Sequence, residues 1–184
     1  MGYSIFITGG ARSGKSTYAE NLAKESLKPV VYIATAIAFD DGMKDRIAKH
    51  QDQRPDNWET IEQYKDFGTL ADHPSFKKAD IVLFDCLTVM TTNNMLDFQV
   101  DYDTCTMDTV SEVEESIKCE VERLLDVCKD KTLILVSNEV GLGLVPSFKL
   151  GSYFRDIAGR MNQLVASRAD KVYFTVSGIP MKLK

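Results

Sequence analysis

The sequence predicts an α/β domain in which helices cover both faces of a mainly parallel sheet. Short runs of β-branched and aromatic residues alternate with longer segments that have a helical period. Each short run is nearly continuous in apolar residues, which is typical of strands that are buried on both faces. The 184 residues are enough for one well-buried core and too few for two. We therefore expect residues 1–184 to form a single domain.

Five strands and five helices are expected along the chain. The apolar runs predict strands at residues 3–8, 30–34, 81–85, 132–137 and 172–176. The periodic segments between them predict helices at residues 15–26, 42–51, 88–96, 110–129 and 154–168. In the first of these helices, Ala19, Leu22 and Ala23 share one face, as expected of a helix that covers a sheet. Residues 97–108 are polar and without a period, so we expect an exposed connection there.

Composition and charge argue against several classes of protein. With 22 Lys and Arg against 27 Asp and Glu, the net charge of −5 repels polyanions, so we expect no nucleic-acid partner. No apolar run approaches the roughly 20 residues that span a bilayer, and the chain starts without a targeting segment. We therefore expect no membrane span and a cytoplasmic protein. The four cysteines form no C-x-x-C pair, which favours free thiols over a zinc site.

A complete phosphate-binding loop, G-x-x-x-x-G-K-S, lies directly between the first expected strand and the first expected helix. Its residues are Gly9, Gly10, Ala11, Arg12, Ser13, Gly14, Lys15 and Ser16. Backbone N–H groups and the helix N-terminus can bind phosphate oxygens, Lys15 can reach the β- and γ-phosphates, and the Ser16 hydroxyl can ligate Mg²⁺. The alternative is a glycine-rich turn with an incidental lysine. The motif and its context predict a P-loop NTPase-type fold that binds a nucleoside triphosphate.

Asp85 ends the apolar run of residues 81–84. A carboxylate at the carboxyl end of such a strand is where phosphate-loop proteins make their second contact with Mg²⁺. The alternative is that Asp85 caps a helix that begins near Thr88. We expect Ser16 and Asp85 to form the metal site.

His50 can be interpreted in two ways. Its spacing from Met43 and Ile47 places the three side chains on one stripe of a helix, which is typical of a core histidine. However, His50 also lies between Arg46 and Arg54, two cations that could bind phosphates. Neighbouring cations lower the pKa of an imidazole, and the neutral ring is the form that can attack phosphorus. His50 is therefore a candidate nucleophile, and Arg46 a supporting phosphate contact.

An ordered set of motifs extends over nearly the whole chain. Its members are Thr8 to Ser16, Tyr32 to Thr35, Arg46-Ile47, His50, Arg54-Pro55, Trp58, Thr60, Glu62, Asp85 to Thr88, Asn138 to Gly141, Val145-Pro146, Phe154 to Asp156, Ala158 to Arg160, Asn162-Gln163, Ala169-Asp170 and Ser177 to Pro180. In this set the chain resembles the bifunctional adenosylcobinamide kinase / adenosylcobinamide-phosphate guanylyltransferase family of cobalamin biosynthesis. The phosphate loop alone is shared by many families, whereas the ordered set is far more specific.

The resemblance implies two reactions. In the first, the γ-phosphate of ATP or GTP passes to the hydroxyl of adenosylcobinamide, a corrinoid. In the second, GMP from GTP passes to the resulting phosphate through a guanylyl-histidine at His50, which gives adenosylcobinamide-GDP. Mg²⁺ and a homotrimer are implied too. The implied nucleotide contacts are the loop residues 9–16 and Ala34, Thr35, Ala36, Gln51, Asp52, Gln53, Arg54, Glu62 and Asp85.

Three other functions are considered. A simple small-metabolite kinase would use the loop and leave His50 structural. A GTP-binding switch is disfavoured because residues 138–141, Asn-Glu-Val-Gly, differ from the N-K-x-D guanine motif. A structural module would bind nucleotide without turnover.

No general base for the kinase step is evident. Glu139 and Asp156 are candidates by position alone, and we expect them instead to cap helices or to pair with Arg155 and Arg160.

Overall fold

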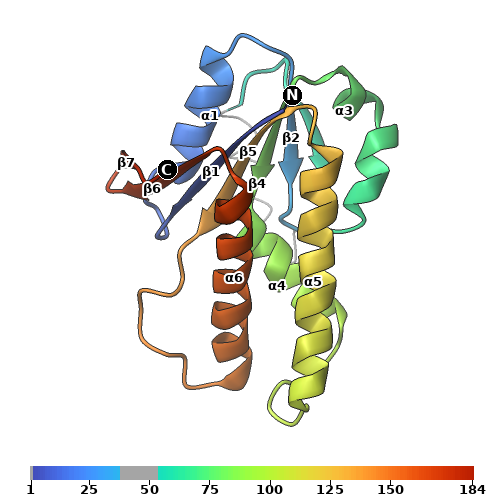
Figure 1. Ribbon diagram of the computed structural model, residues 1–184, viewed down its shortest axis with the longest axis vertical. Helices are drawn as coiled ribbons and strands as arrows, with labels where there is room; N and C mark the ends of the chain where they lie inside the picture. Colours follow the sequence, from blue (N-terminus) through green and yellow to red (C-terminus); the bar gives the residue numbers. More distant parts are fainter. Residues whose placement is uncertain (1, 38–53) are drawn as a thin grey trace.

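The computed structural model describes residues 2–37 and 54–184, which form a seven-stranded sheet in the order β3-β2-β4-β5-β1-β6-β7 (Figure 1). Neighbouring strands are parallel except β6 and β7, which pair antiparallel. The strands are β1 (Tyr3–Gly9), β2 (Val30–Ala34), β3 (Glu59–Glu62), β4 (Ile81–Asp85), β5 (Thr132–Asn138), β6 (Lys171–Val176) and β7 (Ile179–Lys182). The predicted α/β class with a mainly parallel sheet is confirmed.

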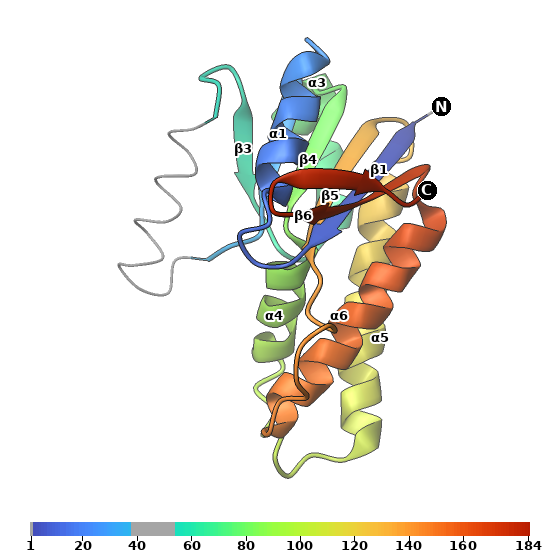
Figure 2. The same cartoon turned by 90° about the vertical axis from the view of Figure 1, so that its left-hand side faces the viewer.

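Helices cover both faces of this sheet (Figure 2). One face carries α1 (Lys15–Glu25), whose Ala19 and Ala23 are buried against the strands. The other face carries α5 (Met107–Val127) and α6 (Lys149–Arg168), which lie side by side. The shorter elements pack on this second face as well: the 3-10 helix η1 (Phe67–Asp72), α3 (Pro74–Lys78) and α4 (Leu87–Asp97).

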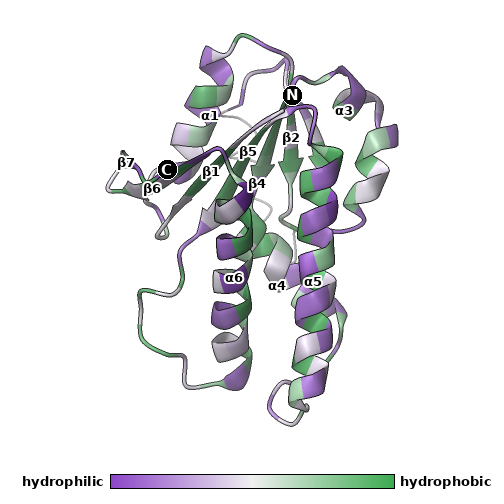
Figure 3. Cartoon of the chain, viewed as in Figure 1, coloured by the Kyte–Doolittle hydropathy of each residue, from purple (hydrophilic) through white to green (hydrophobic). Residues whose placement is uncertain are grey.

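The alternation of side chains along the strands creates two core layers. In β1, Phe6 belongs to the layer under α5 and α6, while its neighbour Ile7 belongs to the layer under α1. Ile33 and Tyr32 of β2 divide in the same way. Both layers exclude water, and the central strands are mainly apolar (Figure 3).

All five expected strands are present, and two further strands were not predicted. β3 has a single buried residue, Ile61, because it lies at one edge of the sheet. β7 forms the other edge and contains Pro180, a residue that weakens the strand pattern and is tolerated at edges. Edge strands lack the continuous apolar run that predicted the central ones.

Four expected helices are present with shifted ends, and the helix expected at residues 42–51 lies outside the described residues. α5 begins at Met107, before the expected Val110, because the Thr106 hydroxyl accepts a hydrogen bond from the Thr109 N–H (3.3 Å) and caps the helix. α6 begins at Lys149 rather than at Phe154.

The sequence predicts an exposed connection at residues 97–108, but part of it is buried. Tyr102 is only 6% exposed, and its hydroxyl donates to the carbonyl of Met95 (2.8 Å). A single aromatic anchor gives no periodic pattern, so the sequence did not indicate it. Within residues 2–37 and 54–184, no helix is long and apolar enough to cross a membrane.

Candidate active site

The phosphate loop joins β1 to α1 at the edge of the sheet where the parallel strands end. Gly14 has a φ of 91°, which favours glycine, and a Cβ atom there would lie 2.9 Å from the Cα of Gly178. The N–H of Gly178 donates to the Ser13 carbonyl (2.8 Å). The turn between β6 and β7 therefore braces the loop from behind.

Lys15 lies across the loop and is only 8% exposed. Its ammonium group donates to the carbonyl of Gly10 (3.1 Å). Burial lowers the pKa of Lys15, while the nearby Cys86 and Asp85 act in the opposite direction. The ammonium group is thus partly desolvated, a condition that strengthens its attraction to a phosphate.

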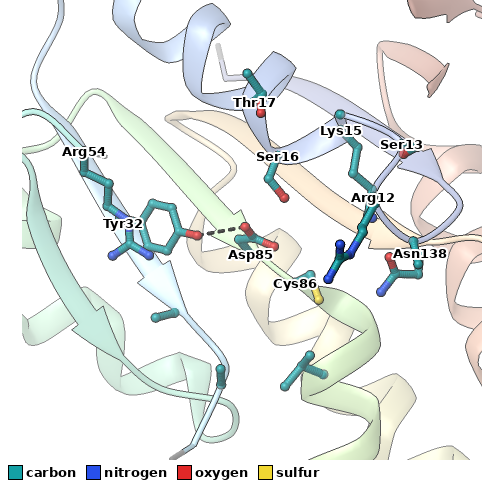
Figure 4. A pocket seen from close by; sticks show the side chains of 15 residues that line it. Arg12, Ser13, Lys15, Ser16, Thr17, Tyr32, Arg54, Asp85, Cys86 and Asn138 are labelled. Atoms are coloured by element: carbon teal, nitrogen blue, oxygen red, sulfur yellow. Dashed lines mark hydrogen bonds between the residues drawn. The ribbon is translucent and has the colours of Figure 1, made fainter. Parts of the chain in front are cut away.

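A cavity of about 530 Å³ opens beside this loop (Figure 4). It brings together many of the predicted nucleotide contacts: Ala11, Arg12, Ser13, Gly14, Lys15, Ser16, Ala34, Ala36, Arg54 and Asp85. It is also lined by residues that were not predicted, namely Thr17, Tyr32, Cys86, Val89 and Asn138. A volume in this range is typical of small-ligand sites.

Asp85 is held by Tyr32 rather than by the helix that follows it. The Tyr32 hydroxyl donates to Asp85 Oδ2 (2.8 Å), the contact drawn in Figure 4. Cys86 occupies the N-cap of α4, and no side chain caps that helix end. The alternative role of Asp85 as a helix cap is therefore wrong, and its carboxylate faces the cavity.

Tyr32 is held at one face of its ring and at its hydroxyl. The guanidinium carbon of Arg54 lies 3.4 Å from the centre of the Tyr32 ring, and Arg54 Nη1 donates to Thr60 Oγ1 (3.2 Å). Burial and the neighbouring carboxylate of Asp85 raise the pKa of Tyr32 well above its ordinary value, so the hydroxyl stays protonated and donates. A chain of contacts thus runs from β3 through Arg54 and Tyr32 to Asp85.

Ser16 and Asp85 face the same cavity (Figure 4). A hydroxyl and a carboxylate are hard oxygen ligands of the kind that Mg²⁺ binds, with phosphate oxygens and water completing its shell. Within the described ranges, no cluster of three or more His, Cys, Asp or Glu side chains could hold a metal. The pair fits a magnesium ion whose other ligands are phosphate oxygens and water.

Four of the implied nucleotide contacts that the structure describes do not line this cavity: Gly9, Gly10, Thr35 and Glu62. Thr35 is 1% exposed, and its Oγ1 donates to the carbonyl of Cys86 and accepts from the Cys86 N–H, both at 2.8 Å. It therefore holds the turn between β4 and α4. Glu62 is exposed on the edge strand β3. Gly9 and Gly10 begin the loop, and a Cβ atom on Gly9 would lie 2.4 Å from the carbonyl oxygen of Thr175.

Asn138 was not predicted to line the nucleotide site, although its position at the end of a buried strand is a clear signal. It ends the buried strand β5, as Asp85 ends β4, and β5 lies between β4 and the loop strand β1. Its N–H donates to Thr88 Oγ1 (2.6 Å), and its carbonyl accepts from Asn162 Nδ2 (3.1 Å). The backbone of Asn138 is thereby fixed at the cavity wall.

Glu139 and Asp156 cap none of the described helices, and Asp156 acts on Arg160 through its charge alone. Glu139 Oε1 accepts from the Gly141 N–H (2.8 Å) in a turn. Asp156 lies inside α6, well after its first residue, Lys149, so it caps nothing. Arg160 instead pairs with Glu114 of α5 through two hydrogen bonds, and these raise its pKa.

Five of the predicted residues lie outside the described residues. They are Arg46, His50, Gln51, Asp52 and Gln53.

Comparisons with known proteins agree over nearly the full chain. A model of the family described as "CobU: Cobinamide kinase / cobinamide phosphate guanyltransferase" matches residues 5–183. The bifunctional adenosylcobalamin biosynthesis protein CobU of Escherichia coli (strain K12) is 42% identical over 182 residues, which are 98% of this chain and 99% of that protein. The bifunctional adenosylcobalamin biosynthesis protein CobP of Pseudomonas aeruginosa is 41% identical over 180 residues, which are 97% and 95% of the two chains.

A likeness to a solved structure supports the fold alone. An ATPase of the type III secretion system of pathogenic bacteria has a TM-score of 0.54 and 12% sequence identity, covering 94% of this chain and 50% of that one.

Proposed function

Because the chain belongs to the cobinamide kinase / cobinamide phosphate guanyltransferase family, we propose that one phosphate loop serves both of its reactions and that His50 carries GMP in the second. The protein is a bifunctional transferase, a kinase and a nucleotidyltransferase of adenosylcobalamin biosynthesis.

In the kinase step, the hydroxyl of adenosylcobinamide attacks the γ-phosphorus of ATP or GTP. The new P–O bond forms as the bond to the β,γ-bridging oxygen breaks, and the nucleoside diphosphate leaves. Lys15 and the loop N–H groups hold the phosphates and offset their charge. Ser16 and Asp85 would hold Mg²⁺, and Tyr32 orients the Asp85 carboxylate. When bound, the ion offsets the charge of the leaving phosphates.

In the guanylyl-transfer step, a neutral ring nitrogen of His50 attacks the α-phosphorus of GTP and pyrophosphate leaves. A phosphate oxygen of adenosylcobinamide phosphate then attacks the same phosphorus. The bond from nitrogen to phosphorus breaks, which frees His50 and gives adenosylcobinamide-GDP. In this proposal Arg54, which lines the cavity, binds the phosphates.

The position of Arg54 is the observation that supports the role of His50. Arg54 lines the nucleotide cavity and stacks on Tyr32, which holds Asp85. Residues 50 and 54 are separated by four peptide units, so their Cα atoms can be at most about 14 Å apart. A histidine so tethered to the cavity can reach a bound triphosphate.

The test uses GTP labelled at the α-phosphate, incubated with the protein and Mg²⁺. The wild type should carry a covalent label that acid removes and alkali does not, as a phosphoramidate requires. The chain has two histidines, so His73 supplies a matched control. His73 Nδ1 accepts from the Ser75 N–H (3.2 Å) at the start of α3, and His73→Asn keeps an N-cap acceptor.

His50→Ala should lose the label, and His73→Asn should keep it. Label retained on His50→Ala would refute the assignment. A wild type that releases the nucleoside diphosphate but never becomes labelled would favour the simple kinase, with His50 structural.

We also propose a homotrimer, which the family resemblance implies, and a cytoplasmic location, which the sequence predicts. Sedimentation equilibrium should give three times the mass of the chain, and a monomer at assay concentrations would contradict the first of them.

A further inference from the structure

A second cavity, of about 490 Å³, lies between the carboxyl end of β1 and helix α6, on the face of the sheet opposite α1. Apolar side chains, among them Phe6 and Val172, line part of it. The remainder of the lining is polar, and neither the phosphate loop nor Asp85 contributes to it. None of the roles assigned above uses this cavity.

Two buried polar groups on its wall have no partner. Thr8 is only 7% exposed, and its Oγ1 makes no hydrogen bond. Arg155 Nη1 is also buried without a partner. An unpaired buried donor is unfavourable, and few are left in native folds. Both groups line the same cavity from different elements, β1 and α6, so a ligand that bonds to both would explain why the fold keeps them.

The charges of the lining identify the class of that ligand. The lining contains two arginines, Arg155 and Arg160, and two acidic residues, Glu139 and Asp156. Arg160 is already paired with Glu114, so the cavity has no surplus positive charge with which to attract a phosphate. It does offer donors and acceptors together. Neutral carboxamides need both, because each has two N–H donors and a carbonyl acceptor.

The two cavities share a wall made by the end of β5. Asn138 lines the nucleotide cavity, and the next residue, Glu139, lines the second cavity. The N–H of Glu139 donates to the carbonyl of Gly9 at the start of the phosphate loop (2.9 Å). Asn162 lines the second cavity, and its amide hydrogen-bonds to Ser137 (2.6 Å) and to Asn138 (3.1 Å). A ligand in the second cavity would therefore be separated by this wall from a nucleotide bound at the phosphate loop.

We propose that the second cavity binds carboxamide arms of the corrinoid substrate, with Arg155 as the principal donor to their carbonyl oxygens. Cobinamide is a corrin ring that carries primary carboxamide side chains, so its chemistry matches the mixed lining. Asp156 and Glu139 accept the amide N–H groups, and Thr8 Oγ1 completes the set. The inference rests on the proposed function, since it takes cobinamide as the molecule that receives the phosphate.

The test measures the binding of adenosylcobinamide directly, by equilibrium dialysis without nucleotide, with the corrinoid read by its absorbance. Arg155→Met keeps the length of the side chain and removes the guanidinium. It should raise the dissociation constant about tenfold to a hundredfold, the usual effect of losing a hydrogen bond from a charged group. Thr8→Val should raise it a few-fold. The control is Arg168→Met on the same helix, since Arg168 pairs with Glu122 (3.1 Å) and lines neither cavity.

Steady-state kinetics and thermal unfolding separate binding from a structural role. Arg155→Met should raise the KM for adenosylcobinamide and leave the KM for ATP unchanged. Its melting temperature should equal or exceed that of the wild type, because the change removes an unpaired buried group. A lower melting temperature together with a raised KM for ATP would overturn the proposal, since it would show a structural role.

The failure of this inference can be told from the failure of the proposed function. A wild type that phosphorylates adenosylcobinamide while Arg155→Met binds it as tightly overturns the inference alone. A wild type that neither binds nor phosphorylates adenosylcobinamide overturns both.

Discussion

The two cavities on either side of the β5 wall differ in how their charged groups are held. In the nucleotide cavity, Ser13 Oγ and Arg54 Nε are buried without partners, but Lys15 bonds to Gly10 and Asp85 accepts from Tyr32, so these two charged groups are oriented before a ligand arrives. In the second cavity, Thr8 and Arg155 have buried atoms without partners. The first arrangement is suited to stabilising charge that develops during a reaction, because it needs no reorganisation. The second is suited to recognition, because a ligand gains bonds that the empty protein lacks.

The largest effect that this comparison predicts is that of Lys15→Ala. Removing the partly desolvated ammonium group should lower kcat for both reactions by at least about a hundredfold, if both use the same loop as proposed. The binding of adenosylcobinamide in the second cavity should not change. The exposed Lys28 supplies the control, Lys28→Ala, which should behave as the wild type. Steady-state assays of both reactions and dialysis provide the measurements; loss of only one reaction would show that the two do not share the loop.

Tyr32→Phe should have the next largest effect. The variant keeps the ring that Arg54 stacks on and removes the hydrogen bond to Asp85. Partners that orient a metal ligand typically contribute about tenfold to a hundredfold, so the Mg²⁺ concentration for half-maximal rate should rise by that order. Tyr64→Phe is a matched control, because Tyr64 also donates to an aspartate, Asp97 (3.0 Å), outside both cavities. Equal Mg²⁺ dependence in both variants would mean that Tyr32 does not position Asp85.

Glu114→Gln should have the smallest effect and sharpen the charge argument for the second cavity. Arg160 is half exposed, so its pair with Glu114 should contribute only about 0.5 kcal/mol to the free energy of unfolding. The melting temperature should fall by about 1–2 °C. Because Glu114 pairs with Arg160 in the wild type, Arg160 is not among the donors assigned to the corrinoid. The affinity of Glu114→Gln for adenosylcobinamide should therefore stay within about twofold of that of the wild type. Tighter binding of inorganic phosphate than of adenosylcobinamide by the wild type would contradict the carboxamide assignment.

The sequence revealed the nucleotide cavity because its main element is contiguous. Eight successive residues, from Gly9 to Ser16, form the phosphate loop, and their spacing requires no knowledge of the fold. Asp85 could be found because it ends an apolar run. Tyr32 could not, since it looked like one more aromatic residue of a buried strand, and its bond to Asp85 depends on how β2 and β4 pair.

The second cavity could not be predicted because distant segments build it. Thr8, Glu139 and Arg155 meet only when β1, β5 and α6 have packed. The hydrogen-bonded ion pair of Arg160 could not be predicted for the same reason: its partner, Glu114, lies on α5. The edge strands β3 and β7 were missed because β3 has one buried residue and β7 has none, so neither contains a continuous apolar run.

The central claim is that the two reactions share one phosphate loop and differ in their use of His50. The most direct measurement assays a single preparation of His50→Ala for both reactions, beside the wild type and with the melting temperature recorded. Phosphorylation of adenosylcobinamide should continue at near the wild-type rate while transfer of GMP is lost. A variant that melts with the wild type yet has lost phosphorylation, or that still transfers GMP, would contradict this claim.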